Sequence, residues 1–243
     1  MAPPASILIP TRRRRDYLAV ALASAAPQAR EHGAELIVVE DDPEDAETRA
    51  LAEQHGARYL AHGEPRGLNA ARNTAIAAAQ ADLLCFLDDD AAAWPGWLAA
   101  LIAAAAEHPE HEAFGGPIKA QLEDTNLHAS GREPPPVTTL DLGPDDRDAE
   151  FVWGANLTLR RQALERIGSF DPGLDLYGDE EDWQRRLKDA GGRIRYVAAA
   201  ASTTAARAPT RARASRRRSP PSCARWPAAC GTSCAAAAAT GSC

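Results

Sequence analysis

The chain has 243 residues, of which 45% are hydrophobic, and this size fits one α/β domain or one domain with a tail. Its formal net charge of −7 argues against nucleic acid as a partner. No stretch approaches the roughly 18–20 apolar residues that span a bilayer. The apolar run Ser6–Ile9 is too short for a signal peptide and is followed by four arginines. We therefore expect a cytoplasmic protein.

The first half of the chain alternates short apolar runs with helical patterns. This alternation is typical of parallel strands joined by crossover helices, and it predicts an α/β fold. We expect strands at Ala5–Pro10, Glu35–Val39, Arg58–Leu60 and Asp82–Leu87, and helices at Asp16–Ala25, Pro43–His55, Gly67–Ala79 and Pro95–Ala106.

The second half is less regular. A loop rich in Pro, Asp and Gly is expected at Leu122–Glu150, a length that suggests a functional role. A helix is predicted at Gly178–Ala190, because acids fill its first turn and bases follow, as the helix dipole favours. The remaining expected elements are strands at Phe114–Lys119, Phe151–Arg160 and Ile194–Val197, with a short helix ending at Ile167.

The composition changes sharply near Ala198. Beyond this point there is no Asp, Glu, Lys, Ile, Leu, Val or Phe, and seven arginines stand without acidic neighbours. Such a segment lacks the side chains needed for a core, so we expect residues 198–243 to form a disordered, low-complexity tail after a domain at 1–197, and to be dispensable for folding. A basic arm for nucleic acid or anionic lipid is the functional alternative.

A frameshift explains this restricted set of residue types better than a basic arm does. If Ser202 is encoded as TCN, reading the codons of residues 201–206 one base earlier yields Leu or Val, then Asp, His and Arg. The four late cysteines have neither the spacing nor the histidines of a zinc site, and Cys85 is expected to be a small buried hydrophobe.

Polar clusters follow three of the predicted strands. They are Pro10–Arg12, Glu40–Asp42 and Asp88–Asp90. Ligands bind beyond the carboxyl ends of strands in an open parallel sheet, so these clusters should share one site. Three adjacent carboxylates repel one another unless a cation is present, and Mg²⁺ or Mn²⁺ prefers oxygen ligands. Asp88 and Asp90 are two apart and would point the same way in an extended segment. The alternatives are a solvated acidic loop or helix capping by Asp90.

Seven segments in order resemble the family 2 glycosyltransferases, over about residues 5–197. They are Ser6–Thr11, Glu35–Asp42, Gly67–Asn73, Phe86–Asp90, Trp153–Asn156, Gly168–Asp171 and Asp179–Trp183 followed by Arg185 and Arg186. The resemblance implies a GT-A type nucleotide-diphospho-sugar transferase fold, with a mostly parallel central sheet flanked by helices. It also implies an inverting transfer of a sugar to an acceptor hydroxyl.

The resemblance assigns donor and metal roles to residues at the strand ends. Asp41 would accept a hydrogen bond from the base, Arg72 would lie near the diphosphate, and Asp89 would reach the ribose. Asp88 and Asp90 would hold Mg²⁺ or Mn²⁺, which acts as a Lewis acid on the departing diphosphate. The other residues expected to bind the donor are Pro10, Thr11 and Arg12. A surface position is the alternative for Arg72.

The acceptor hydroxyl must lose its proton as it attacks, so a carboxylate base is needed nearby. Similarity to the family's acidic motif favours Glu180, with Asp179 and Glu181 as rivals; acids that merely favour the helix dipole are the alternative. The acceptor side is expected to include Gly154 and Asn156. Trp183 and Trp153 would stack on a sugar face or lie in the core.

One departure from the family pattern concerns a histidine. Family members often carry a His after the last strand as a further metal ligand, whereas this chain has none after His128. A catalytically impaired nucleotide-sugar binder is therefore an alternative. A sugar nucleotidyltransferase is another, although the arginines after the first strand lack the glycines it would need. The acceptor could be a glycan, a lipid-linked molecule or a small molecule, and peripheral contact with the inner face of the membrane stays open.

Overall fold

The computed structural model describes residues 2–120, 140–174 and 179–204. The contacts of the chain define one compact unit over residues 1–208. The expected loop at Leu122–Glu150 falls largely outside the described residues, as do residues 205–243. Among the described residues, no helix combines the length and the apolar character needed to cross a bilayer.

The first half of the chain builds parallel strands joined by helices. The pairs β1–β2, β2–β3 and β1–β4 are all parallel, with Ser6 opposite both Glu35 and Leu84. The elements are β1 Ser6–Thr11, α1 Arg15–His32, β2 Glu35–Glu40, α2 Ala46–Gln54, β3 Arg58–Ala61, α3 Leu68–Ala78 and β4 Leu83–Leu87. The predicted α/β fold with its crossover helices is therefore confirmed.

The second half extends this sheet with mixed pairing. Strand β9 (Asn156–Arg160) is antiparallel to both β4 and β6 (Ala113–Gly115), so β6 runs in the same direction as β4. The sheet order is β3-β2-β1-β4-β9-β6-β10-β8, with β10 at Ile194–Tyr196 and β8 at Arg147–Ala149. The remaining helices are α4 Trp97–Glu107, α5 Arg161–Ile167 and α6 Asp179–Asp189.

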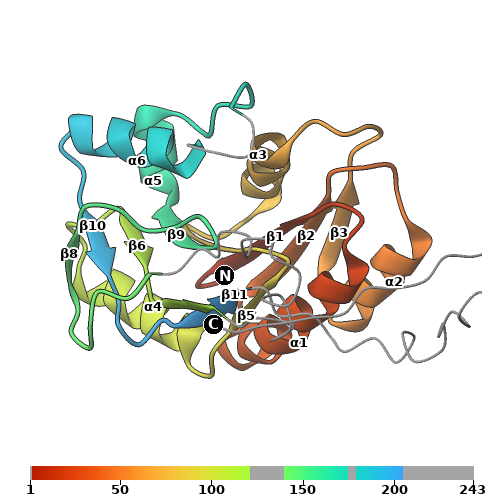
Figure 1. The fold of residues 1–243 in the computed structure, drawn as a ribbon, viewed down its shortest axis with the longest axis horizontal. Helices are drawn as coiled ribbons and strands as arrows, with labels where there is room; N and C mark the ends of the chain where they lie inside the picture. The colour runs from red at the N-terminus through yellow and green to blue at the C-terminus, as the bar shows by residue number, and fades with distance from the viewer. Residues whose placement is uncertain (1, 121–139, 175–178, 205–243) are drawn as a thin grey trace, which may run out of the picture. The chain divides into compact units, whose positions relative to one another are not determined.

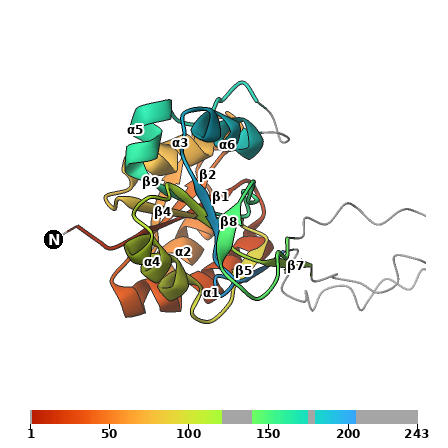
Figure 2. The same cartoon turned by 90° about the vertical axis from the view of Figure 1, so that its left-hand side faces the viewer.

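Helices cover both faces of the large sheet. Figures 1 and 2 show α3, α5 and α6 above it and α1, α2 and α4 below it. Successive strand residues point to opposite faces, so Ile7 and Ile9 pack in the lower core with Leu18 and Leu101, while Leu8 packs in the upper core. Cys85 is fully buried in the lower core, and this burial raises the pKa of its thiol to about 12. The prediction of a buried Cys85 is confirmed.

Helix α1 is longer than the sequence indicated. It continues from the expected end at Ala25 through Pro27 to His32 and stops at Gly33, whose φ of 65° is the left-handed conformation typical of a helix C-terminus. Pro27 removes one helical hydrogen bond. The helix nevertheless continues, because its buried face extends through Gln28 and Ala29 against the sheet. Gln28 also accepts a hydrogen bond from Leu98 N and donates one to Trp94 O.

The strand expected at Phe114–Lys119 is two strands that belong to different sheets. Strand β6 ends at Gly115, and β7 (Ile118–Ala120) joins a three-stranded sheet in the order β5-β11-β7, with β5 at Ala91–Ala93 and β11 at Ser202–Thr204. The break at Gly116 has a steric reason. A Cβ atom there would lie 2.0 Å from the carbonyl oxygen of Ala200, so only glycine permits this approach.

The expected domain boundary after Val197 is wrong for residues 198–204. Ala200 and Ser202 are fully buried, and β11 pairs with both β5 and β7. The sequence suggested disorder because large apolar residues are missing here. Small residues are nevertheless what this segment requires, because β11 lies between two strands and Ala200, just before it, lies against Gly116. The rest of the expected tail lies outside the described residues.

Candidate functional site

The carboxyl ends of β1, β2 and β4 bring the three predicted clusters to one edge of the sheet. Strand β1 lies between the other two, so Thr11 stands between Glu40 and the acidic turn at Asp88–Asp90. The chain turns directly after β4, and the N–H of Ala91 donates to the carbonyl of Asp88. Because the segment turns instead of staying extended, the three aspartates do not share one set of partners: Asp88 lies near Arg72, whereas Asp89 and Asp90 both pair with Arg14.

Asp89 points into the protein. Only 4% of the residue is exposed, and its carboxylate accepts a hydrogen bond from Thr11 Oγ1 at 2.7 Å. Burial disfavours the charged form and raises the pKa of Asp89 to about 7, although Arg14 and Thr11 act in the opposite direction. Thr11 and Asp89 were both expected to bind the donor, and the structure joins them directly.

Arg14 neutralises the acidic turn. Its guanidinium lies 3.1 Å from Asp89 and donates to Asp90 at 2.6 Å. Burial alone would lower the pKa of Arg14, but the two carboxylates more than offset this effect and the pKa is raised. From the sequence this residue was only one member of an arginine run. Its role depends on the turn that precedes α1, where Arg13 has a φ of 53°, unusual for a residue with a side chain.

Asp41 connects the end of β2 to the start of α3. Its carboxylate accepts backbone hydrogen bonds from Arg66 at 2.8 Å and Gly67 at 2.9 Å, and His62 Nδ1 lies 2.9 Å away. Three neighbours in the protein therefore already use much of its hydrogen-bonding capacity. A nucleobase would have to donate to a lone pair that these neighbours leave available. The role of Asp41 in binding the base therefore stays a prediction. Nothing in the sequence pattern singled out His62.

Arg72 is buried, contrary to the surface alternative. It is 3% exposed, it lies over the ring of Phe170 at 5.4 Å, and its guanidinium is 4.0 Å from Asp88. A Cβ atom on Gly154 would be 2.7 Å from this guanidinium and 3.3 Å from the carboxyl carbon of Glu180. The absence of a side chain at Gly154 thus lets the Arg72 guanidinium and the Glu180 carboxylate lie close to the same backbone position.

Glu180 is the predicted base whose surroundings are best defined. It is half-buried, and Gly154 N donates to its Oε1 at 3.4 Å. Glu181, the next residue, is exposed. The side chain of Asp179 lies outside the described part of the structure. The Asp182 carboxylate is held by Arg186 and Arg185, whose hydrogen bonds lower its pKa.

Two of the expected acceptor-side residues are part of the core. Asn156 is fully buried, accepts from Trp97 Nε1 at 2.8 Å and donates to Ala200 O at 2.8 Å. Trp183 is also fully buried and donates to Gly168 O, so the core alternative is the one the structure shows. Trp153, by contrast, is 37% exposed. The sequence could not separate these positions, since an asparagine or tryptophan next to a site looks the same whether it faces ligand or core.

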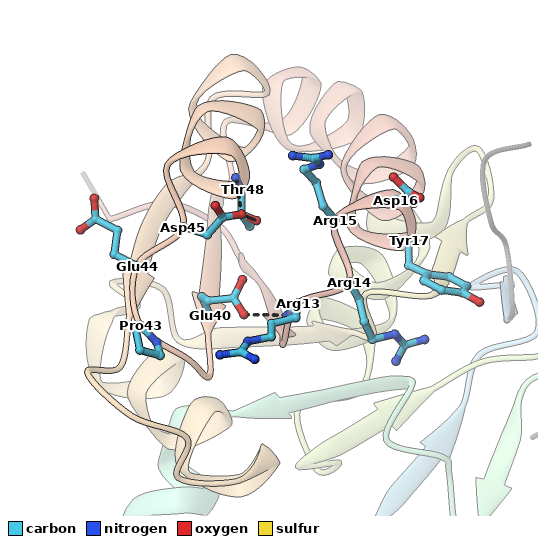
Figure 3. A pocket seen from close by; sticks show the side chains of 10 residues that line it. All are labelled: Arg13, Arg14, Arg15, Asp16, Tyr17, Glu40, Pro43, Glu44, Asp45 and Thr48. Atoms are coloured by element: carbon cyan, nitrogen blue, oxygen red, sulfur yellow. Dashed lines mark hydrogen bonds between the residues drawn. The ribbon is translucent and has the colours of Figure 1, made fainter. Parts of the chain in front are cut away.

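A cavity of about 620 Å³ lies beside the acidic turn, between the starts of α1 and α2. Figure 3 shows Arg15 and Thr48 on its two helices, with Glu40 below Thr48 and hydrogen-bonded to Arg13. Its described lining includes none of the six residues predicted to bind the donor. Glu40 accepts from Arg13 N through one oxygen, while its buried Oε2 has no hydrogen-bond partner. Burial raises the pKa of Glu40, and the Arg13 N–H acts against this effect.

Pro10 and Arg12 complete the predicted donor set. Pro10 is buried in β1 opposite Val39, whereas the Arg12 side chain is 57% exposed and lies 3.7 Å from Asp42. Pro10 therefore shapes the end of β1, and Arg12 lies at the exposed margin of this sheet edge.

The acidic turn has the chemistry of a site for a hard divalent cation. The side chains of Asp88 and Asp90 are 33% and 28% exposed, so their oxygens reach solvent at the sheet edge. The nearby Arg14 shows that this cluster already attracts positive charge. Carboxylate oxygens of this kind suit Mg²⁺ or Mn²⁺.

Two solved structures share the fold. A GalNAc-T7 structure with UDP, GalNAc and Mn²⁺ aligns with a TM-score of 0.65 at 14% identity, covering 84% of this chain and 44% of that one. The mannosyltransferase PcManGT of Pyrobaculum calidifontis, in complex with GDP-Man and Mn²⁺, aligns with a TM-score of 0.60 at 20% identity, covering 87% and 59%. The predicted GT-A fold is confirmed.

Sequence comparison gives the family. A pre-mycofactocin glycosyltransferase of Mycobacterium tuberculosis (strain CDC 1551 / Oshkosh) is 31% identical over 147 residues, which cover 58% of this chain and 30% of that protein. The chain thus matches less than a third of this relative's length. The sequence profile of Glycosyl transferase family 2 matches residues 6–168, more than half of the chain. The protein is therefore a member of glycosyl transferase family 2.

Proposed function

We propose that this protein transfers a sugar from a nucleotide-diphospho-sugar donor to an acceptor hydroxyl. The observation that carries the proposal is that the buried Arg72 lies close both to Asp88 of the acidic turn and to Gly154, which Glu180 also approaches. A diphosphate leaving group needs positive charge, and an attacking hydroxyl needs a base. Family membership and the nucleotide ligands named for the two similar structures support the same reaction class.

Asp88 and Asp90 would hold the divalent cation, Mg²⁺ or Mn²⁺. When bound, this cation neutralises charge on the leaving diphosphate. The Mn²⁺ named for both similar structures supports this assignment. Arg72 is buried within 4.0 Å of Asp88, so its fixed guanidinium would add a second positive charge next to the phosphates.

Glu180 would act as the general base of an inverting displacement. Its carboxylate accepts the proton of the acceptor hydroxyl while the hydroxyl oxygen attacks the anomeric carbon from the face opposite the diphosphate. The bond to the diphosphate breaks as the new glycosidic bond forms, so the configuration inverts. The contact between Gly154 N and Glu180 Oε1 orients the carboxylate. Glu181 is exposed and has no such contact with Gly154.

The nucleotide would lie along the ends of β1 and β2. Thr11, Asp41 and Asp89 form the floor of this edge through their mutual contacts, with Pro10 and Arg12 beside them. The cavity next to it adds Glu40, whose buried Oε2 could accept a hydrogen bond from a base or ribose. The acceptor is a glycan, a lipid-linked molecule or a small molecule.

A catalytically impaired nucleotide-sugar binder is the second candidate. The observation in its favour is the lack of any histidine after His128, where family members often carry a further metal ligand. This candidate shares donor binding with the first and differs only in turnover.

The test is calorimetric titration of UDP and GDP into the protein with and without Mn²⁺. We expect metal-dependent binding of one nucleotide, which Asp90→Asn weakens at least about tenfold because it removes a charged metal ligand. The matched control is Asp146→Asn, which removes the same charge from an exposed aspartate outside the acidic turn. Nucleotide binding that is unchanged by Mn²⁺ and by the Asp90 substitution would exclude Asp88 and Asp90 as the metal ligands. Donor hydrolysis or transfer in the same sample then separates the enzyme from the impaired binder.

A further inference from the structure

A second group of metal-binding side chains lies in the turn between α4 and β6. It consists of His108, Glu110 and His111, whose ligand atoms all lie within 4.8 Å of one another. Because β6 runs parallel to β4, this turn at the start of β6 is at the sheet edge opposite the carboxyl end of β4. The group is therefore separate from the acidic turn at Asp88–Asp90. Within the described residues it is the one group of three such side chains that lie this close together.

His111 is the central side chain of the group. It is 1% exposed, and its Nε2 lies 2.8 Å from Asp148 of β8. The carboxylate of Asp148 also forms an ion pair with Arg193 and accepts from His111 Nε2, so the proton of a neutral His111 ring lies on Nε2 and the lone pair on Nδ1.

The other ring nitrogen of His111 is buried without a hydrogen-bond partner. Its Nδ1 lies 3.0 Å from Glu110 Oε1, yet the geometry is not that of a hydrogen bond. His108 Nδ1 lies 3.4 Å from the same carboxylate oxygen. A cation would satisfy all three groups, and a carboxylate on the far nitrogen of a histidine is the usual partner of a metal-binding imidazole.

The turn is held in place independently of any metal. The Arg160 guanidinium donates to the carbonyl oxygens of His111, Ala105 and His108, two of them in the turn itself. The ligand side chains therefore start from an ordered backbone. On the open side, the side chains of Glu110 and His108 are 44% and 26% exposed, which leaves access for an ion and its remaining water ligands.

We propose that His108, Glu110 and His111 form a structural site for a transition-metal ion such as Zn²⁺. Two imidazoles and one carboxylate suit Zn²⁺, Ni²⁺ or Cu²⁺, whereas Mg²⁺ and Mn²⁺ prefer oxygen ligands alone. A bound ion would join the end of α4 to β6 and, through His111 and Asp148, to β8. The site stabilises the fold and takes no part in sugar transfer, so it does not rest on the proposed function.

The test is Zn²⁺ binding to the untagged full chain by competition with a chromogenic chelator. The thiols are first alkylated, and Asp88→Asn with Asp90→Asn removes the other candidate site. We expect one Zn²⁺ per chain, and an affinity lowered at least about tenfold by His108→Gln or Glu110→Gln. His32→Gln, a partly exposed histidine outside the group, is the matched control and should bind as the parent does.

A second measurement distinguishes loss of the metal site from misfolding of the variant. Zn²⁺ should raise the melting temperature of the parent and of the His32 variant but not that of the His108 variant, because only an ion bound to the folded state stabilises it. Two results would overturn the proposal. One is the absence of Zn²⁺ binding. The other is binding that His108→Gln and Glu110→Gln leave unchanged.

Discussion

Two truncations test whether residues 198–204 belong to the folded body. One ends after Val197, at the boundary that composition suggested, and the other ends after Ala208, where the compact unit ends. The shorter chain loses β11, its pairing with β5 and β7, and several further hydrogen bonds to the body. Three of these further bonds run from Trp94 N to Ala201 O, from Ser202 N to Pro117 O, and from Asn156 Nδ2 to Ala200 O.

The expected cost follows from these contacts. Each bond contributes about 1 kcal/mol net, and leaving the fully buried Asn156 without its acceptor adds a further penalty of about 1–3 kcal/mol. For these three bonds and Asn156 alone, the free energy of unfolding should therefore fall by about 4–6 kcal/mol. For a domain of this size, about 1 kcal/mol shifts the melting temperature by roughly 2–4 °C, so we expect a decrease of roughly 8–24 °C.

The assay is thermal unfolding of both truncations beside the full chain, followed by circular dichroism. The chain ending after Ala208 should melt close to the full chain. Ser202→Ala is the internal control, because the buried Ser202 hydroxyl has no hydrogen-bond partner and its loss should leave stability nearly unchanged. Equal melting temperatures for the two truncations would show that β11 does not pack and would restore the boundary at Val197.

The remaining predictions concern the candidate active site. Glu180→Gln should bind nucleotide and Mn²⁺ normally but transfer sugar about 10²–10⁴-fold more slowly, while Glu181→Gln stays near the parent rate; the reverse pattern would identify the neighbour as the base. Arg14→Gln should lower the melting temperature of metal-free protein and enlarge the increase caused by Mn²⁺, whereas Arg12→Gln should change neither. The raised pKa of Asp89, about 7, means that the metal-free folded state holds a proton that the unfolded state has lost. Stability should therefore fall as pH rises from about 4 to 7, and Asp89→Asn should flatten this slope in melts recorded with a chelator.

The strands and the acidic clusters could be predicted because they depend on local sequence. An apolar run such as Leu83–Leu87 is buried on both faces, and the aspartates that follow must lie at the sheet edge where it ends. Strand β11 could not be predicted in this way. Ser202–Thr204 has no apolar pattern, and its place depends on β5 and β7, which come from distant parts of the chain.

The partners of the site residues were also beyond sequence reasoning. The periodicity placed Asp89 and Asp90 at the end of β4, but it could not show that Arg14, more than 70 residues earlier, pairs with both. Such a contact depends on a turn with an unusual backbone at Arg13. The sequence therefore identified where charge gathers, while the structure identifies which opposite charge compensates it.

The choice of base illustrates how tertiary contacts narrow a list of candidates. The sequence offered Asp179, Glu180 and Glu181 as three adjacent acids, and a helix start favours a carboxylate at each. Successive helical positions point in different directions, so one of these acids faces the sheet edge while its neighbour faces solvent. Glu180 is the one that reaches Gly154, and Gly154 is also where Arg72 comes close. The carboxylate that would accept the acceptor's proton and the guanidinium that would stabilise the leaving diphosphate thus both lie next to one glycine. A larger side chain at Gly154 would disturb both, which makes this glycine as necessary to the proposed reaction as either charged group.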